Sequence, residues 1–280
     1  ALLERHADLY ARCKTDIPRF GFIKGNTILV AASYFTDDAE LVQMLIQHGA
    51  DPKAPVGQFD DSCLGLAFGA SNCKVAQCLI EHDLTLLDQR SNQGTLPALL
   101  AFIMGKLEAA KFIKEHYPEA LVKLAQEPAQ QWGGGVIACA LGNNAGNLEA
   151  MNMLLDAGES VELSGKGHGK MGMLLSFCDF ARRFNKLQLG GMVMGFAYTT
   201  RVPPLCAASS TGNLAALKLL LDCGADIHNR GHNPNRLTAL HFAAVGGHAD
   251  VVAALLAAGA RTDLKDKAGR TPADIAKQVG

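Results

Sequence analysis

Hydrophobic residues near the end of the chain come in two short blocks, each followed by a glycine. Residues 238–244 read TALHFAA and precede Gly247, and residues 251–256 read VVAALL and precede Gly259. Apolar residues at helical spacing within each block predict two short helices. Each glycine supplies the left-handed backbone conformation that a tight turn after a helix needs. The pattern therefore predicts a helix, a tight turn, a second helix and a loop.

The same unit recurs on both sides of this stretch. An upstream copy reads PPLCAA from Pro203 and a downstream copy reads TPADIA from Thr271, so that units start at 203, 238 and 271, which are 35 and 33 residues apart. Weaker copies begin near Thr27, Ser62, Leu96 and Ile137. One pair of short helices cannot cover its own apolar faces, so neighbouring units have to stack. The repeats therefore predict an all-α array of stacked helix pairs.

The unit resembles the ankyrin repeat, whose T-P-L-H-x-A-A…G…LL…G-A-D pattern recurs about every 33 residues. The resemblance implies an all-α ankyrin-repeat solenoid of helix-turn-helix units with finger-like loops, about seven to eight units long when degenerate and truncated ones are included. We expect one array over residues 1–280: divergent repeats (26–162), a degenerate basic repeat or an insertion (163–201), and well-matched repeats (202–280). Because the pattern is cut at both ends, we expect the chain to be part of a longer protein.

Two stretches depart from the period. Leu96 and Ile137 are 41 residues apart, and the surplus of eight lies between Tyr117 and Gly135 around Trp132, the single tryptophan. We interpret this stretch either as a binding insertion or as an ordinary surface insertion. Residues 163–201 hold six basic residues against one acidic residue, a net charge of +5 that leaves −1 − 5 = −6 for the rest of the chain. This segment either steers an acidic partner, with Arg182 and Arg183 as its test residues, or is a solvated face.

The resemblance also indicates where a partner binds. In ankyrin repeats the two residues before the turn that ends the inner helix face a concave groove. These positions hold Tyr34 and Phe35 in the first unit, and Ile103 and Met104 in the third. Large apolar side chains at exposed positions are typical of binding hot spots. Either a partner covers them, or the insertion or the first loop with Phe22 folds over them.

A long finger-like loop offers polar contacts. It runs 14 residues from Gly224 to Thr238, against 12 residues from Gly259 to Thr271. We expect its polar residues to set specificity, and they are Asn229, Arg230, His232, Asn235 and Arg236. His228, in the same loop, is interpreted as a loop-to-loop contact.

Composition narrows the classes of function. Hydrophobic residues make up 49% of the chain and aromatic residues only 6%, as alanine-rich repeats that pack closely would require. The formal net charge of −1 gives no whole-chain attraction to nucleic acid or to an anionic membrane. No uncharged apolar run is long enough to span a bilayer, so we expect no membrane span. Eight cysteines without a CxxC pair favour a cytoplasmic or nuclear location, or the host cytosol for a bacterial effector, and we expect a monomer.

Three clusters suggest chemistry, and each has a structural explanation. The first comprises Cys63, Cys73, Cys78 and His82, whose spacings of ten, five and four match no common zinc template, so we predict buried thiols. The second pairs Cys206 with His241 in the same slot of consecutive units, where the resemblance implies a structural histidine that bonds the threonine hydroxyl and a neighbouring loop. The third, residues 165–170, departs from the spacing of a phosphate-binding loop. We expect no metal, no cofactor and no enzymatic activity.

The function that the resemblance implies is protein–protein interaction through the concave groove and the finger loops. The expected partner is another protein, and an acidic surface on it would suit the basic segment. Two alternatives stay open. The chain is either the substrate-recruiting segment of a multidomain enzyme or bacterial effector whose catalytic domain lies elsewhere, or a structural spacer.

Overall fold

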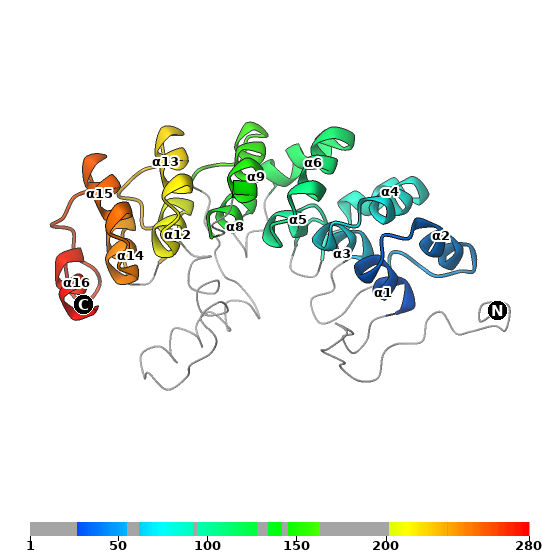
Figure 1. The fold of residues 1–280 in the computed structure, drawn as a ribbon, viewed down its shortest axis with the longest axis horizontal. Helices are drawn as coiled ribbons and strands as arrows, with labels where there is room; N and C mark the ends of the chain where they lie inside the picture. The colour runs from blue at the N-terminus through cyan, green and yellow to red at the C-terminus, as the bar shows by residue number, and fades with distance from the viewer. Residues whose placement is uncertain are drawn as a thin grey trace. The chain divides into compact units, whose positions relative to one another are not determined.

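The computed structural model describes residues 27–54, 62–91, 94–127, 134–141, 145–162, 202–233 and 235–279. These residues form short helices joined by turns and loops, and none of them lies in a β-strand. The helices belong to two compact units, residues 1–124 and 125–280. Figure 1 shows each unit as a succession of paired helices, which confirms the predicted all-α repeat fold.

The described residues of unit 1 form three helix pairs, each made of an inner helix, a tight turn and an outer helix. The pairs are α1 (Ile28–Phe35) with α2 (Ala39–Gln47), α3 (Cys63–Ala70) with α4 (Cys73–His82), and α5 (Leu99–Ile103) with α6 (Leu107–His116). Inner helices pack on inner helices and outer helices on outer helices, in chain order. A short 3₁₀ helix, η3 (Leu84–Asp88), follows α4.

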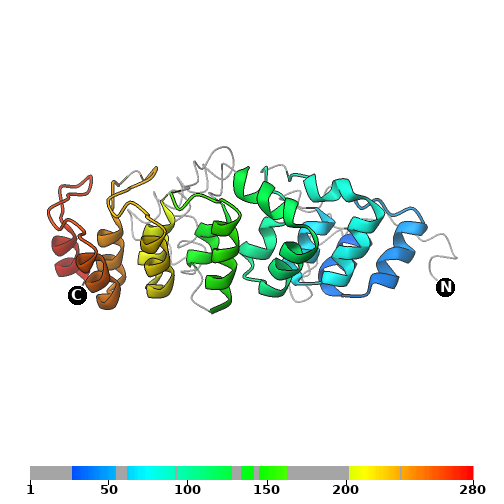
Figure 2. The same cartoon turned by 90° about the horizontal axis from the view of Figure 1, so that it is seen from above.

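Unit 2 repeats this plan among its described residues. Its pairs are α8 (Gly135–Leu141) with α9 (Ala145–Asp156), α12 (Pro204–Thr211) with α13 (Leu214–Asp222), and α14 (Ala239–Gly246) with α15 (Ala249–Ala257), followed by the inner helix α16 (Pro272–Val279). The inner helices α8, α12, α14 and α16 pack in that order. Figure 2 shows the loops after α13 and after α15 rising on the same side of the helices.

The residues at the helix ends explain where the inner helices begin and stop. The Ser62 hydroxyl accepts a hydrogen bond from the N–H of Gly65 at 3.0 Å and so caps the start of α3. Gly212 and Gly247 end α12 and α14 with φ of 71° and 70°, the left-handed conformation that the sequence predicts for them. After α3 the same conformation falls on Ser71, with φ of 68°. A side chain there costs about 1 kcal/mol relative to glycine.

Helix α8 begins without a hydroxyl cap, because Gly134 precedes it. The carboxylate of Glu159, only 4% exposed, accepts hydrogen bonds from the N–H groups of Val136 at 2.8 Å and Gly135 at 3.2 Å. Burial raises the pKa of Glu159 to about 7, although both hydrogen bonds act in the opposite direction. The equivalent position in other repeats is Ala50, Ala225 and Ala260. A buried carboxylate therefore replaces the missing cap of this helix.

Polar side chains at the start of the outer helices tie each repeat to the one before it. The Asn72 amide donates to the carbonyl groups of Ser33 and Tyr34, both at 2.9 Å. Asn213 and His248 make the same kind of contact in unit 2, at 3.4 and 3.2 Å. These carbonyl groups end the preceding inner helix and have no partner within it. Hydrogen bonds as well as apolar packing therefore fix the stacking register.

Of the two departures from the period, the first lies partly within the described residues. Part of the surplus between residues 117 and 135 forms α7 (Pro118–Gln126), which Lys123 links to η3 through an ion pair with Asp88 at 2.6 Å. Residues 163–201 lie outside the described residues, but α8 and α12, the nearest described inner helices on either side, pack directly against each other. Whether that segment is a degenerate basic repeat or an insertion stays a prediction.

Candidate functional site

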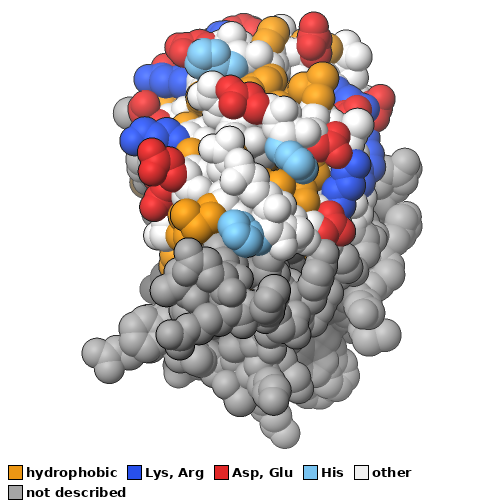
Figure 3. Space-filling view, turned by 90° about the vertical axis from the view of Figure 1, so that its right-hand side faces the viewer, with side chains coloured by type: hydrophobic (Ala, Val, Ile, Leu, Met, Phe, Trp, Pro, Cys, Tyr) orange, Lys and Arg blue, Asp and Glu red, His pale blue; other side chains and the backbone are white. Residues whose placement is uncertain are grey.

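The last turn of α1 presents two aromatic side chains to solvent. Tyr34 is 37% exposed and Phe35 is 44% exposed, and their rings lie 4.9 Å apart in a T-shaped arrangement at 85°. The Asn72 amide holds the Tyr34 carbonyl, so the backbone beneath the pair is tied to the next repeat. Figure 3 shows hydrophobic side chains between charged ones on the described surface of unit 1. A fixed backbone reduces the entropy that these rings would lose on binding.

The equivalent turn of α5 carries a second apolar pair. Met104 is 47% exposed and Ile103 is half-buried. The intervening helix α3 has Gly69 and Ala70 at these positions, and a methyl group on Gly69 would lie 3.6 Å from both Met104 Cγ and Leu100 Cβ. Three successive inner helices therefore end in large, small and large apolar residues.

Unit 2 has polar or small residues at the same positions. In α12 these are Ser210 and Thr211. The Ser210 hydroxyl donates to the Ala207 carbonyl of its own helix, and the Thr211 hydroxyl lies near the carbonyl groups of Ala207 and Ala140. In α14 they are Val245 and Gly246, and a methyl group on Gly246 would lie only 2.4 Å from His248 Cδ2. The apolar helix ends predicted from the sequence are therefore a property of unit 1.

Exposed large hydrophobic side chains follow the same division. Among the described residues, those of unit 1 are Ile28, Tyr34, Phe35, Met44, Leu84, Met104 and Val122, whereas unit 2 has Leu256. The sequence reasoning missed Leu84 and Val122, which lie on η3 and α7. Leu84 could have been found from the sequence, because residues 83–85 read DLT where other repeats end in G-A-D, which places a large apolar residue at a loop position.

The first finger of unit 2, residues 226–238, contains the predicted polar contacts. The Asn229 amide donates to the Glu162 carboxylate, and its oxygen accepts from the N–H of Gly231 at 2.8 Å. Asn229 therefore shapes the finger. His232 and Arg236 are exposed, and Arg236 has a left-handed backbone with φ of 55°. Such a conformation is uncommon for arginine and is held here by the surrounding loop.

The second finger of unit 2, residues 261–271, packs against the first. Arg230 Nη1 donates to the carbonyl of Lys265 at 3.2 Å, and the N–H of Lys267 donates to the carbonyl of Asn235 at 2.9 Å. A depression of about 280 Å³ opens at this junction, lined by Asn235, Asp266, Lys267, Ala268 and Arg270. Arg230 and Asn235 are half-buried, so they contribute to the surface and to the join between the fingers.

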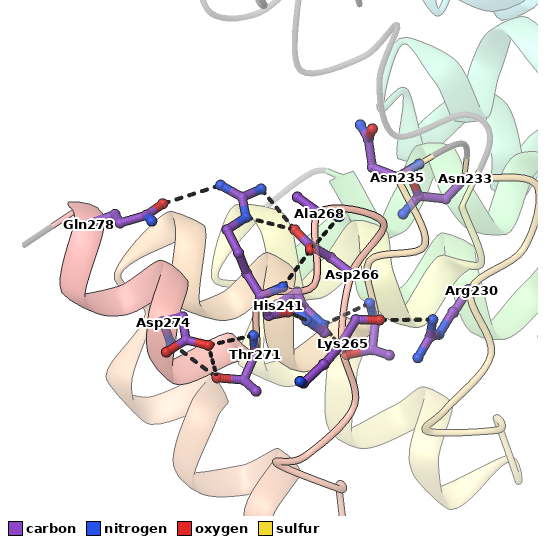
Figure 4. A network of polar contacts seen from close by, with 12 residues as sticks. Arg230, Asn233, Asn235, His241, Lys265, Asp266, Ala268, Thr271, Asp274 and Gln278 are labelled. Atoms are coloured by element: carbon purple, nitrogen blue, oxygen red, sulfur yellow. Dashed lines mark hydrogen bonds and ion pairs between the residues drawn. The ribbon is translucent and has the colours of Figure 1, made fainter.

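A buried carboxylate organises the second finger, as Figure 4 shows. The Asp266 side chain is 1% exposed and accepts from the N–H groups of Ala268 and Arg270 at 2.8 and 2.9 Å. It also accepts from Arg270 Nε and Nη2, at 2.9 and 2.8 Å. Burial opposes ionisation of Asp266, but these hydrogen bonds and the Arg270 charge outweigh it and lower its pKa. The finger is thus held by an ionised, fully bonded carboxylate.

His241 has the structural role that the resemblance implied. Its Nδ1 accepts from the Thr238 hydroxyl at 2.8 Å, and its Nε2–H donates to the Arg270 carbonyl at 3.2 Å (Figure 4). Burial lowers the pKa of His241, in keeping with the neutral form that this geometry requires. The buried Cys206 thiol donates to the carbonyl of Asn229 at 3.6 Å, and burial raises its pKa. Neither side chain is placed as an activated nucleophile or base.

Two other predictions concern single side chains. The prediction for His228 is confirmed, because its Nε2 accepts from the N–H of Arg261 in the next finger at 3.1 Å. The prediction of buried thiols holds for Cys63, whose pKa burial raises to about 12, and is wrong for Cys73 and Cys78. These two are half-buried, because Cys73 opens α4 and Cys78 lines a depression of about 530 Å³ between α2 and α4.

Some predicted residues cannot be placed. Trp132, Arg182 and Arg183 lie outside the described residues, so their role in binding stays a prediction. Within the described ranges, no group of three or more His, Cys, Asp or Glu side chains is arranged to hold a metal ion. The helices in those ranges are also too short or too polar to cross a bilayer.

Comparison with known proteins agrees with the repeat geometry. Models of the ankyrin repeat match residues 24–55 and 204–280. The structure resembles the crystal structure of the human ASB11 ankyrin repeat domain with a TM-score of 0.60, over 90% of this chain and 92% of that chain, at 18% sequence identity. The chain belongs to the ankyrin repeat family.

Curated relatives share parts of the array. Mouse protein phosphatase 1 regulatory subunit 27 is 30% identical over 105 residues, which are 35% of this chain and 67% of that protein. The Caenorhabditis elegans E3 ubiquitin-protein ligase hecd-1 is 41% identical over 71 residues, 25% of this chain but 2% of the ligase. The chain thus spans only a small part of the longer relatives. Ankyrin repeats generally mediate protein–protein interaction, through extended surfaces built from successive repeats.

Proposed function

We propose that the chain is a protein-binding module whose main contact surface is the row of inner-helix ends in unit 1. The observation that carries the proposal is the exposure of Tyr34, Phe35 and Met104 on helices whose register is fixed by hydrogen bonds and packing. Exposed apolar side chains on a rigid scaffold are what binding hot spots require. Ile103, half-buried beside Met104, completes this surface.

The order of large and small residues supports an apolar ligand. Gly69 and Ala70 lie between the two large pairs, so a partner side chain placed over α3 would contact apolar groups on both sides. Burying such groups stabilises a complex by about 25 cal/mol for each Å² removed from water. The predicted partner is therefore a protein segment that presents aromatic or aliphatic side chains to this apolar surface.

The fingers of unit 2 would add specificity. Arg230, His232, Asn235 and Arg236 are at least partly accessible there, whereas Asn229 mainly holds the loop. Polar groups at the rim of an interface choose between partners and contribute less to affinity than buried apolar anchors. A cytoplasmic or nuclear location and a monomeric state belong to the same proposal.

The proposal can be tested with peptide ligands selected on the whole chain from a random displayed library. The dissociation constant of the tightest peptide is measured by calorimetry for the wild type and for Tyr34→Ala combined with Phe35→Ala. We expect the double variant to lose about 2 kcal/mol or more, because truncated aromatic anchors leave apolar groups of the ligand unpaired. Far-UV circular dichroism should be unchanged, since both rings are partly exposed.

Two further variants sharpen this test. Ala70→Arg places a charged side chain between the two apolar pairs and should abolish binding of the same peptide. The control variant Leu256→Ala removes a side chain of α15 that is as exposed as Phe35, and it should leave the affinity for the peptide unchanged. If every selected peptide binds Tyr34→Ala/Phe35→Ala and Ala70→Arg as tightly as the wild type, the apolar surface is not the binding site. That outcome would mean that the peptides bind elsewhere on the chain.

A second function is favoured by the relatives. A matching stretch forms 2% of the E3 ubiquitin-protein ligase hecd-1, so an array like this one can be a small part of an enzyme. In that setting the apolar surface would recruit the substrate of a catalytic domain outside these residues. Both proposals use the same binding surface. Assays of the isolated chain for ligase or hydrolase activity test whether the repeats themselves catalyse a reaction, and we expect no activity.

A further inference from the structure

The join between the two fingers of unit 2 sets which residues lie near one another. Two hydrogen bonds connect the fingers, from Arg230 Nη1 to the Lys265 carbonyl and from the N–H of Lys267 to the Asn235 carbonyl. Figure 4 shows the first of these bonds, with Arg230 directed at the second finger. The second bond places Lys267 beside the segment that continues into Arg236. Basic residues of one finger are therefore brought near basic residues of the other.

The acidic residues of the fingers do not neutralise these cations. The fingers contain Arg230, Arg236, Arg261, Lys265, Lys267 and Arg270 against Asp226, Asp263 and Asp266, a net charge of 6 − 3 = +3. Asp266 is buried and bound to Arg270, and Asp263 binds Arg261 through both oxygens, at 3.0 and 2.7 Å. The Asp226 carboxylate accepts from the N–H of His228 at 2.8 Å.

Four cations are left over on this surface, namely Arg230, Arg236, Lys265 and Lys267. They form no ion pair with another described residue, and all but the half-buried Arg230 are exposed. Asp274 acts electrostatically on Lys265, but its carboxylate accepts from the Thr271 N–H and hydroxyl at 2.9 and 2.8 Å. Like charges held near each other repel, so an anion placed between them is stabilised.

We propose that this finger surface, Arg230, Arg236, Lys265 and Lys267 around the depression at Asn235, binds an acidic segment of a partner protein. This proposal takes from the proposed function only that the ligand is a protein, and it uses none of the residues of the apolar surface. A carboxylate side chain is small enough to enter a depression of about 280 Å³. A nucleic acid fits less well, because its dense phosphate charge would also meet the exposed Asp226 and Asp263.

The test measures binding of charged probes to the whole chain by fluorescence anisotropy. The probes are a fluorescein-labelled glutamate-rich peptide, the same peptide with each glutamate replaced by glutamine, and a single-stranded DNA oligonucleotide of equal charge. We expect the glutamate peptide to bind about tenfold or more tightly than the glutamine peptide. Its affinity should fall several-fold between low and physiological salt, because exposed charges are screened.

Matched variants locate the site. Lys265→Gln combined with Lys267→Gln should weaken the glutamate peptide about tenfold, whereas Lys218→Gln combined with Lys277→Gln removes two exposed lysines outside the fingers and should leave it unchanged. Equal binding of the two peptides, unchanged affinity in the finger variant, or tighter binding of the oligonucleotide would each overturn the proposal. Tyr34→Ala/Phe35→Ala should bind the glutamate peptide like the wild type, so failure at one surface is distinguishable from failure at the other.

Discussion

The two units share one repeat plan and differ in what they expose. In unit 1 the inner helices α1 and α5 end in the large apolar pairs Tyr34–Phe35 and Ile103–Met104. Seven of the eight exposed large hydrophobic residues of the described chain belong to this unit. In unit 2 the corresponding helix ends are polar or small, and the fingers carry a dense set of hydrogen bonds and a net positive charge. Apolar contact and charge are thus separated along one chain.

This difference shows that the scaffold and the surface are specified by different positions. Buried leucine, alanine and capping residues recur at the same offsets in both units and build the helix pairs. The residues at the ends of the inner helices and on the fingers are not needed for stacking, so they can change freely between repeats.

The largest expected effect is on the fingers of unit 2. Asp266→Ala removes the acceptor of two backbone N–H groups and of the Arg270 guanidinium from a buried site. It should lower the free energy of unfolding by about 3 kcal/mol or more, measured by urea titration of the whole chain with circular dichroism. Asp263→Ala, which breaks an exposed pair with Arg261, should leave the urea midpoint nearly unchanged. Equal effects of the two variants would show that burial of Asp266 does not stabilise the finger.

The next effect is a pH dependence of stability that arises from the buried Glu159 in unit 2. The folded pKa of Glu159, about 7, lies above its ordinary value of 4.5, so the folded state binds the proton more tightly than the unfolded state. The stability that this group contributes is complete below pH 4.5 and is lost as the pH rises to about 7, a change of about 2 to 3 kcal/mol. Glu159→Gln should remove this change, measured as the difference between variant and wild type in urea titrations at pH 5 and pH 8. Parallel pH profiles would contradict the raised pKa.

Much of the fold could be predicted from the sequence, because repeats constrain it at many offsets. Gly212 and Gly247 mark helix ends because glycine readily adopts the left-handed conformation. His241 makes its structural bonds because Thr238 lies three residues before it in the same unit. The candidate surfaces were harder to predict. Tyr34 and Met104 were found because their positions in the unit are defined, whereas Leu84 lies on η3, which replaces a regular finger.

The repeat pattern could not reveal the hydrogen bonds between residues that are far apart in the sequence. The cap of α8 comes from Glu159, 24 residues after Gly135, and only the folded chain brings them together. Likewise the basic finger surface depends on bonds between Arg230 and Lys265 and between Asn235 and Lys267, which lie in different repeats. Pattern matching identifies each repeat separately, and these contacts are between positions that the pattern leaves variable.

The most direct test of the account is amide hydrogen exchange of the whole chain with and without the tightest library-selected peptide. If unit 1 binds through its inner-helix ends, protection should increase in the last turns of α1, α3 and α5, around residues 33–36, 68–72 and 102–106. The outer helices α2 and α4 should exchange as in the free chain. Protection confined to those outer helices, or to the fingers of unit 2, would contradict the assignment of the apolar surface as the main binding site.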